Sequence, residues 1–161
     1  MGSFAIARDD PASADVQALL GQHLAFAHRH SPPEDVHALN AARLGAGSIA
    51  FFSARENGDL LGIGALKQLD PSHAELKSMH TAEAARGRGV GRAMLEHLIA
   101  VARARGCLRV SLETGSMAAF APARALYESA GFHVCEPFGE YWAGLNSTCM
   151  TLELTPPAQS R

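Results

Sequence analysis

The chain has 161 residues, 47% of them hydrophobic and 19% charged, a composition typical of one folded domain. Its 14 Lys and Arg against 16 Asp and Glu leave a formal net charge of −2, which excludes binding to nucleic acid through overall positive charge. The cysteines Cys107, Cys135 and Cys149 form no C-x-x-C pair, so neither a disulfide framework nor a thiolate metal site is indicated. We predict a single domain over residues 1–161 that ends in a frayed tail at 155–161.

Apolar residues are scattered along the chain in short runs. The longest unbroken runs, 98–102 and 117–121, are far shorter than the roughly 18 residues that a membrane span requires. The first residues, Met1 to Ile6, lack the basic region of a signal peptide. The sequence therefore predicts a cytoplasmic protein with neither membrane nor nucleic acid among its partners.

The first quarter of the chain predicts one strand and two helices. Apolar and polar residues alternate over 4–8, as in a short strand. Ser13 can cap a helix whose apolar residues keep helical spacing from Val16 to Ala27. A second helix is expected over 36–44, between a Pro-Pro break and Gly45.

Three strands are expected next. Strand-like runs at 49–54 and 60–69 flank the pair Asn57-Gly58, which is typical of a β-hairpin turn. A further strand over 74–80 leads into a loop rich in glycine and arginine.

The second half predicts two more helices and three more strands. Apolar residues at helical spacing run from Gly91 to a stop at Gly106, and again from Ala119 to Gly131. Strands are expected over 109–114, 132–134 and 149–154. Taken in order, these elements predict one mixed α/β or α+β sheet.

The loop between the third of these strands and the next helix has the sequence Arg86-Gly87-Arg88-Gly89-Val90-Gly91-Arg92. Its glycines let backbone N–H groups approach an anion, and the helix start adds unpaired donors and the positive end of a dipole. A Walker A loop would require Gly-Lys-Ser/Thr at its end, and a dinucleotide fingerprint would require glycine where Arg92 stands. The loop therefore indicates a discrete polyanionic ligand bound in neither of those ways.

The segment from Leu76 to Phe132 resembles the acetyl-CoA-binding core of the GNAT superfamily of acyl-CoA-dependent N-acyltransferases. The family signature R/Q-x-x-G-x-G/A corresponds to Arg86, Gly89 and Gly91. The later signature A-x-x-L-Y-x-x-x-G-F corresponds to Ala123, Leu126, Tyr127, Gly131 and Phe132. The resemblance implies a mixed, mostly antiparallel central sheet of about six to seven strands flanked by about four helices. It also implies an acetyl-CoA-dependent N-acetyltransferase.

The resemblance also implies where acetyl-CoA binds. Amides of the loop from Arg86 to Arg92 would hold the pyrophosphate. The backbone of Met79, His80 and Thr81 would pair with the pantetheine arm, and one of these amides could polarise the thioester carbonyl. Phe120, where the family often has asparagine, would pack against the cofactor, and Ala123 and Tyr127 complete the expected set.

Direct transfer to an amine requires an acid and a base. By the same resemblance, Tyr127 is the candidate acid for the departing thiolate. Glu75 is the first candidate for the base, Glu113 the second, and His80 a third because neutral imidazole titrates in the right range. No cysteine falls at a catalytic position of the two signatures, so an acyl-cysteine route has no support.

The acceptor pocket is expected, again from the family, between residues 28–37 and 138–142. Glu34, Asp35 and Glu140 could hold a cationic amine, and Arg29 or Lys77 could hold a carboxylate. The eight histidines include no H-E-x-x-H and no cysteine partners, so no metal is predicted.

The expected reaction is direct transfer of acetyl from acetyl-CoA to a primary amine of a small molecule. Two alternatives stay open: an enzyme that acetylates a protein N-terminus, a lysine or an alcohol, and a CoA-binding regulatory module without turnover. The expected partner is the small-molecule acceptor, and a homodimer is an open assembly state.

Overall fold

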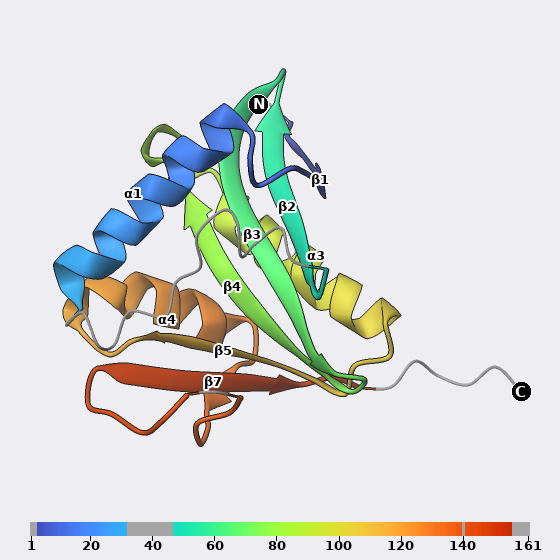
Figure 1. Cartoon of the computed structure of the whole chain (residues 1–161), viewed down its shortest axis with the longest axis vertical. Helices are drawn as coiled ribbons and strands as arrows, with labels where there is room; N and C mark the ends of the chain where they lie inside the picture. Colours follow the sequence, from blue (N-terminus) through green and yellow to red (C-terminus); the bar gives the residue numbers. More distant parts are fainter. Residues whose placement is uncertain (1–2, 32–46, 140, 156–161) are drawn as a thin grey trace, which may run out of the picture.

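A computed structural model of the chain describes residues 3–31, 47–139 and 141–155. It has one seven-stranded sheet in the order β1-β2-β3-β4-β5-β7-β6 (Figure 1). The strands are β1 (Ala5–Arg8), β2 (Ile49–Glu56), β3 (Asp59–Asp70), β4 (His73–Thr81), β5 (Arg109–Gly115), β6 (His133–Val134) and β7 (Ser147–Glu153). The α-helices are α1 (Ala14–His30), α3 (Val90–Ala104) and α4 (Ala121–Ser129), with short 3-10 helices at Glu83–Ala85 and Ala118–Phe120.

The predicted fold class is confirmed. The described strand pairs are antiparallel except for β4 and β5, which run parallel, and the seven strands lie within the expected number. Three α-helices are described where about four were expected. The helix expected over 36–44 lies outside the described residues, as do residues 156–161 of the expected tail.

Local signals in the sequence set the ends of several elements. Helix α1 begins after Ser13, whose side chain makes no capping hydrogen bond, and it ends at His30, with the C-cap residue Ser31 directly before a proline. In the β2–β3 hairpin, Asn57 and Gly58 have φ of 52° and 86°, the left-handed values that a two-residue turn between antiparallel strands requires. The predicted hairpin turn is confirmed, and it fixes where β2 and β3 begin to pair.

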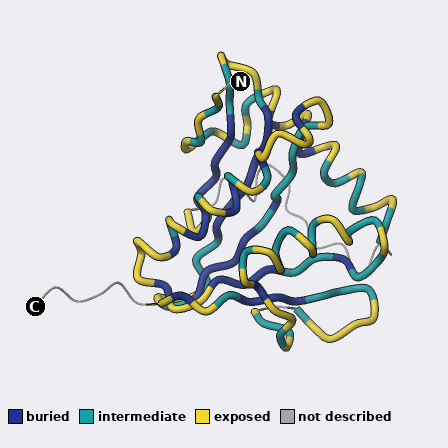
Figure 2. The backbone as a smooth tube through the Cα atoms, turned by 180° about the vertical axis from the view of Figure 1, so that it is seen from behind, coloured by how far each residue is buried: buried dark blue, intermediate teal, exposed yellow. Residues whose placement is uncertain are grey.

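The two faces of the sheet pack against different helices. On one face Val16, Leu19 and Leu20 of α1 bury against Phe51 of β2 and Ile63 of β3. On the other face, α3 buries its apolar stripe against β3, β4, β5 and β7; its buried residues are Val90, Met94, Leu95, Leu98, Ile99 and Ala102. Figure 2 shows that buried residues concentrate along the central strands, while the outward faces of the helices are exposed.

Close contact between α3 and the sheet depends on two glycines of β3. A Cβ atom at Gly62 would lie 2.9 Å from Val90 Cγ1, and one at Gly64 would lie 2.8 Å from Met94 Cγ. These glycines let the first turns of α3 lie directly on β3, and so they fix the position of the loop that precedes the helix.

Strands β4 and β5 pair only at their beginnings. The parallel register joins His73 to Arg109, Ala74 to Val110 and Glu75 to Ser111, and no later pair is formed between these two strands. Figure 1 shows them starting together and then diverging, with α1 in front of the gap. The sheet is therefore split along half its length, and we call this region the β4–β5 fork.

A bulge in β4 lies at the same level as the fork. Ile63 and Ala65 of β3 are opposite His80 and Lys77 of β4, so β4 carries one extra residue there, and Ser78 has a φ of 57°. As a result Lys77 and His80, three residues apart, both lie on the face that α1 covers. Among the described residues, no helix is long and apolar enough to cross a membrane.

Candidate active site

A cavity of about 520 Å³ occupies the β4–β5 fork. Its walls come from residues 76–81 of β4, residues 112–115 of β5, the C-terminal part of α1, and α4 with the 3-10 helix before it. Arg86 lines one end of the cavity, and Tyr141, from the segment between β6 and β7, also lines it. The cavity therefore lies between the two signatures singled out in the sequence.

The glycine-arginine loop leads directly into α3. Gly87 and Gly89 have φ of 80° and 81°, and Gly89 is the N-cap residue of the helix. A Cβ atom at either position would meet nothing within 4 Å, so their role is conformational rather than one of close packing. The loop thus presents open backbone at a helix N-terminus, an arrangement that suits a phosphate group.

The three arginines of the loop have different surroundings. Arg86 lines the cavity. Arg88 donates from Nη2 to Glu56 Oε2 at 2.7 Å, and Arg92 donates from Nη2 to Ser129 Oγ at 3.0 Å. Of the three arginines, only Arg86 lines the cavity. Arg88 and Arg92 form hydrogen bonds with neighbouring elements.

A smaller hollow of about 150 Å³ joins the cavity to the start of α3. Met79, His80, Thr81, Ala123 and Tyr127 line both spaces, and Val90 and Gly91 line only the smaller one. The residues expected to bind the pantetheine arm therefore form a continuous wall from the fork to the loop. This wall fits an extended chain that ends in a pyrophosphate.

Tyr127 lies on α4 in the wall shared by the two spaces. Its ring packs edge-on against Phe132 with a centroid distance of 6.0 Å. Burial raises its pKa to about 12, so the hydroxyl keeps its proton throughout the neutral range. Tyr127 therefore carries a proton at the cavity wall, although burial makes it a weaker acid than free tyrosine.

Glu75 is buried in a cluster with Lys77 and Tyr141. The Lys77 ammonium donates to Glu75 Oε2 at 3.0 Å and to Tyr141 Oη at 2.7 Å, and the Tyr141 hydroxyl donates to the same Glu75 oxygen. Burial and the negative charge of Glu75 raise the pKa of Tyr141. Of the described residues in this cluster, Lys77 and Tyr141 line the cavity and Glu75 does not.

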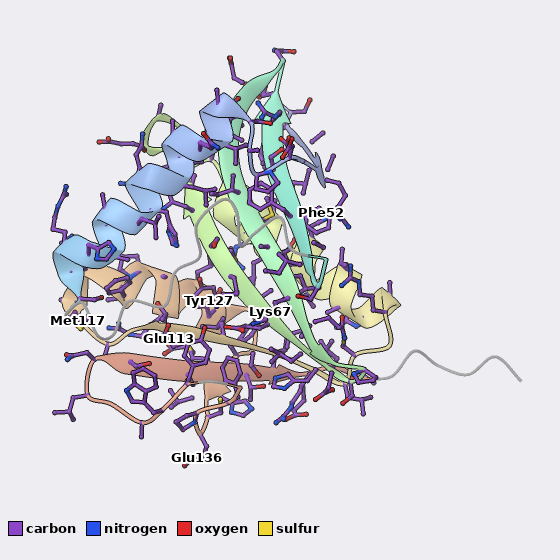
Figure 3. The ribbon with its side chains drawn as sticks, viewed as in Figure 1. Phe52, Lys67, Glu113, Met117, Tyr127 and Glu136 are labelled. Carbon is purple, nitrogen blue, oxygen red and sulfur yellow. The ribbon has the colours of Figure 1, made fainter. Side chains whose placement is uncertain are left out.

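Glu113 lies on β5 and lines the cavity. Its Oε1 accepts a hydrogen bond from Ser147 Oγ at 2.8 Å, which fixes one side of the carboxylate. Figure 3 shows Glu113 and Tyr127 in the region where β4 and β5 diverge. Of the two candidate carboxylates, Glu113 lines the cavity and Glu75 does not, so Glu113 is better placed for direct contact with an acceptor.

His80, the third candidate base, pairs with His23 of α1. Their Nδ1 atoms are 3.2 Å apart, and their rings meet edge to face at 71°. Burial lowers the pKa of both imidazoles, with the Arg86 charge adding to the effect at His80, and the pKa of His23 falls to about 4. Both rings line the cavity as neutral groups at pH 7, with one Nδ1 donating to the other.

Phe120 closes the cavity between α1 and β5. A Cβ atom at Gly115 would clash with the Phe120 ring, so the ring lies directly on the β5 backbone. Its other side meets Phe26 of α1 at a centroid distance of 5.3 Å. Arg124 holds this turn by donating to the carbonyl oxygen of Gly115 at 2.6 Å. Phe120 can therefore form an apolar wall of the cavity.

The expected acceptor wall is only partly described. Glu34, Asp35 and Glu140 lie outside the described residues. Arg29 is exposed and, within the described part of the chain, does not line the cavity, whereas Lys77 does.

Sequence reasoning missed other wall residues, including His23 and Phe26 of α1. They are three residues apart on one helix face. That spacing also fits an ordinary packed helix, so it gave no separate signal.

Comparison with known proteins agrees with this geometry. The family described as Acetyltransferase (GNAT) family matches residues 16–132. YsnE of Bacillus subtilis strain 168 is 48% identical over 91% of this chain and 97% of its own. YedL of Escherichia coli strain K12 is 43% identical over 94% of this chain and 95% of its own. Both relatives are named N-acetyltransferases.

Among solved structures, a GNAT family acetyltransferase from Elizabethkingia anophelis with acetyl-CoA bound has the same fold. It superposes with a TM-score of 0.68 at 18% identity, covering 94% of this chain and 98% of that one.

Proposed function

Since the chain belongs to the GNAT family of acetyltransferases and is an acetyl-CoA-dependent N-acetyltransferase, we propose that it transfers the acetyl group directly to a primary amine of a small molecule. The observation that carries this proposal is the cavity in the β4–β5 fork. One end opens toward the glycine-arginine loop, and the other holds the carboxylate of Glu113.

In the proposed complex, acetyl-CoA lies along the wall shared by the two spaces. The backbone of residues 86–92 and the Arg86 guanidinium bind the pyrophosphate. Met79, His80 and Thr81 border the pantetheine arm, and Ala123 forms the opposite side. Acetyl-CoA supplies an acyl group activated as a thioester, and the protein supplies its placement beside the acceptor.

Proton transfer is assigned to groups that line the cavity. Glu113 takes the proton of the acceptor ammonium, directly or through one water, and so frees the nitrogen lone pair for attack on the thioester carbonyl. A backbone amide of residues 79–81 stabilises the negative charge that develops on that oxygen. Tyr127, which keeps its proton at neutral pH, gives it to the departing sulfur, and the second proton that the nitrogen loses as the amide forms restores the neutral phenol.

The cysteine positions support direct transfer. All three cysteines belong to the described part of the chain, and none of them lines the cavity. Cys107 and Cys149 are buried, so neither can take up the acyl group from a bound donor. The acceptor amine must therefore attack the thioester itself.

The covered position of the cavity favours a small acceptor. α1 and Phe120 cover it on the side away from α3, and the aromatic contact between Phe26 and Phe120 ties these two walls together. A free amine of modest size fits in such a space more readily than the side chain of a folded protein surface.

The test is to measure CoA release from acetyl-CoA with three sets of acceptors: small primary amines, peptides with free N-termini or lysines, and alcohols. We expect turnover with small amines to exceed turnover with peptides and alcohols. Turnover only with peptides or only with alcohols would overturn the proposed acceptor class. Calorimetric CoA binding without turnover in any set would indicate a binding module and would overturn the proposed reaction.

A further inference from the structure

The charged groups that line the cavity are few. Among the described residues they are Arg86, Lys77 and Glu113, besides the neutral pair of histidines. Arg86 lies at the end where the proposed function places the pyrophosphate. Lys77 and Glu113 remain, one on each strand of the fork, where the proposed function places the acceptor.

Lys77 is held firmly in an unusual place for a lysine. Its side chain is 9% exposed and that of its partner Glu75 is 4% exposed, so the ion pair is removed from bulk water. The Glu75 carboxylate and the Tyr141 hydroxyl fix the position of the ammonium. Burying such a pair carries a desolvation penalty that its own attraction often fails to offset, so the pair is weakly explained by stability alone.

The cluster presents its positive end to the cavity. Lys77 lines the space, whereas Glu75 lies behind it and behind Tyr141. An ammonium group has three N–H donors, and the contacts to Glu75 and Tyr141 use two of them. Among the described residues no third partner contacts the ammonium, so its third donor can serve a ligand in the cavity that Lys77 lines.

Resting on the proposed function above, we propose that the acceptor is a small amino acid, an amine that also carries a carboxylate, and that Lys77 binds this carboxylate while Glu113 receives the ammonium. The two residues are then specificity determinants on opposite strands of the fork. An acceptor with both charges would satisfy both residues, whereas an amine without an anion would leave the third Lys77 donor without a charged partner.

The first experiment uses the wild-type enzyme and pairs of acceptors that differ only in charge. Each of several α-, β- and γ-amino acids is compared with its own carboxamide, and kcat/KM is measured at saturating acetyl-CoA. A charge-assisted hydrogen bond predicts a preference of about tenfold or more for the carboxylate in the best pair. This comparison requires no variant, so it tests the proposed acceptor class even if a substitution prevents folding.

The second experiment removes the ammonium without leaving a buried charge. The double variant Lys77→Met with Glu75→Gln neutralises both partners, and it should bring the carboxylate-to-carboxamide ratio to within about twofold of one. Lys67→Met is the matched control, because Lys67 is opposite Glu75 on β3 but, among the described residues, does not line the cavity. The control should keep the wild-type ratio; Figure 3 labels Lys67 on the sheet.

The outcomes separate the inference from the proposed function. If small amines are acetylated but carboxamides serve as well as carboxylates, the amino acid assignment is overturned and the amine acetyltransferase stands. If the double variant keeps the wild-type ratio, Lys77 is not the recognition group. If no small amine is acetylated, the proposed function fails, and this inference fails with it.

Discussion

The two ends of the cavity are built in different ways. At the start of α3, one continuous segment, residues 86–92, presents backbone groups and left-handed glycines. At the β4–β5 fork, side chains from β4, β5 and the segment before β7 come together, with Lys77, Glu113 and Tyr141 lining one space. The first end should therefore respond to changes in backbone conformation, and the second to the loss of single functional groups.

The largest effect is expected at the fork. Glu113→Gln keeps the size of the side chain but cannot accept a proton at neutral pH, so kcat/KM should fall by between about 10² and 10⁴-fold. Glu75→Gln should lower kcat/KM less, because Glu75 reaches the cavity only through Lys77 and Tyr141. Steady-state kinetics over a range of pH, with acetyl-CoA affinity measured separately, checks both variants. A larger loss in Glu75→Gln would place the base behind the cavity wall.

Tyr127→Phe tests the wall that the two ends share. Phenylalanine keeps the ring that packs against Phe132 and removes only the proton donor, so kcat should fall by about 10²-fold while CoA affinity stays unchanged. Single-turnover kinetics and calorimetry separate the two quantities. Full kcat in this variant would mean that water protonates the thiolate and that Tyr127 is structural.

The paired histidines in the cavity should make the stability of the fold sensitive to acid. The pKa of His23 is about 4 in the folded protein and near 6.5 unfolded, so between these values the unfolded chain binds more protons and stability falls as pH falls. Lowering the pH from 7 to 5 should reduce the free energy of unfolding by about 1–2 kcal/mol through this residue. Denaturant unfolding at both pH values measures the loss. His23→Gln should show a smaller dependence; an equal dependence would assign the effect to other groups.

At the loop end, Gly89→Glu should place bulk and negative charge beside the pyrophosphate site. CoA affinity should fall at least about tenfold, or about 1.4 kcal/mol. Gly106→Glu is the matched control: Gly106 has a φ of 80°, no atom would lie within 4 Å of its Cβ, and it follows the other end of α3. Both variants carry similar backbone strain, so calorimetry should show weakened binding only for Gly89→Glu. Equal losses would mean that strain in α3, rather than contact with CoA, sets the affinity.

Signals confined to a few adjacent residues could be interpreted from the sequence. Ser13 and Asn57-Gly58 act within one turn, and the helix after Gly89 follows from the spacing of its own apolar residues. The loop from Arg86 to Arg92 is of the same kind, because its conformation and the helix start are set by neighbouring residues. The order of the elements and a mixed sheet could therefore be predicted from local signals, while the mostly antiparallel arrangement followed from the resemblance to the GNAT superfamily.

Which of the two carboxylates lines the cavity could not be predicted. Glu75 and Glu113 both lie on strands, but only Glu113 of the two lines the cavity, whereas Glu75 accepts a hydrogen bond from Tyr141, which is far away in the sequence. The extra residue in β4 at Ser78 turns His80 onto the same face as Lys77, and no turn residue in the sequence marks it. Such positions are decided by which strands pair and where they diverge, a property of the whole sheet.

The smallest effect is expected at Arg88, in the loop from Arg86 to Arg92. Arg88 is bound to Glu56 at 2.7 Å in a partly exposed ion pair, while Arg86 lines the cavity. Arg86→Ala should weaken CoA binding by about tenfold, the value of one charge-assisted hydrogen bond, whereas Arg88→Ala should change it by less than about twofold. Loss of the ion pair should cost at most about 1 kcal/mol of stability. If calorimetry shows equal losses of CoA affinity, Arg88 must leave Glu56 when CoA binds, and side chains would then matter at the loop end as they do at the fork.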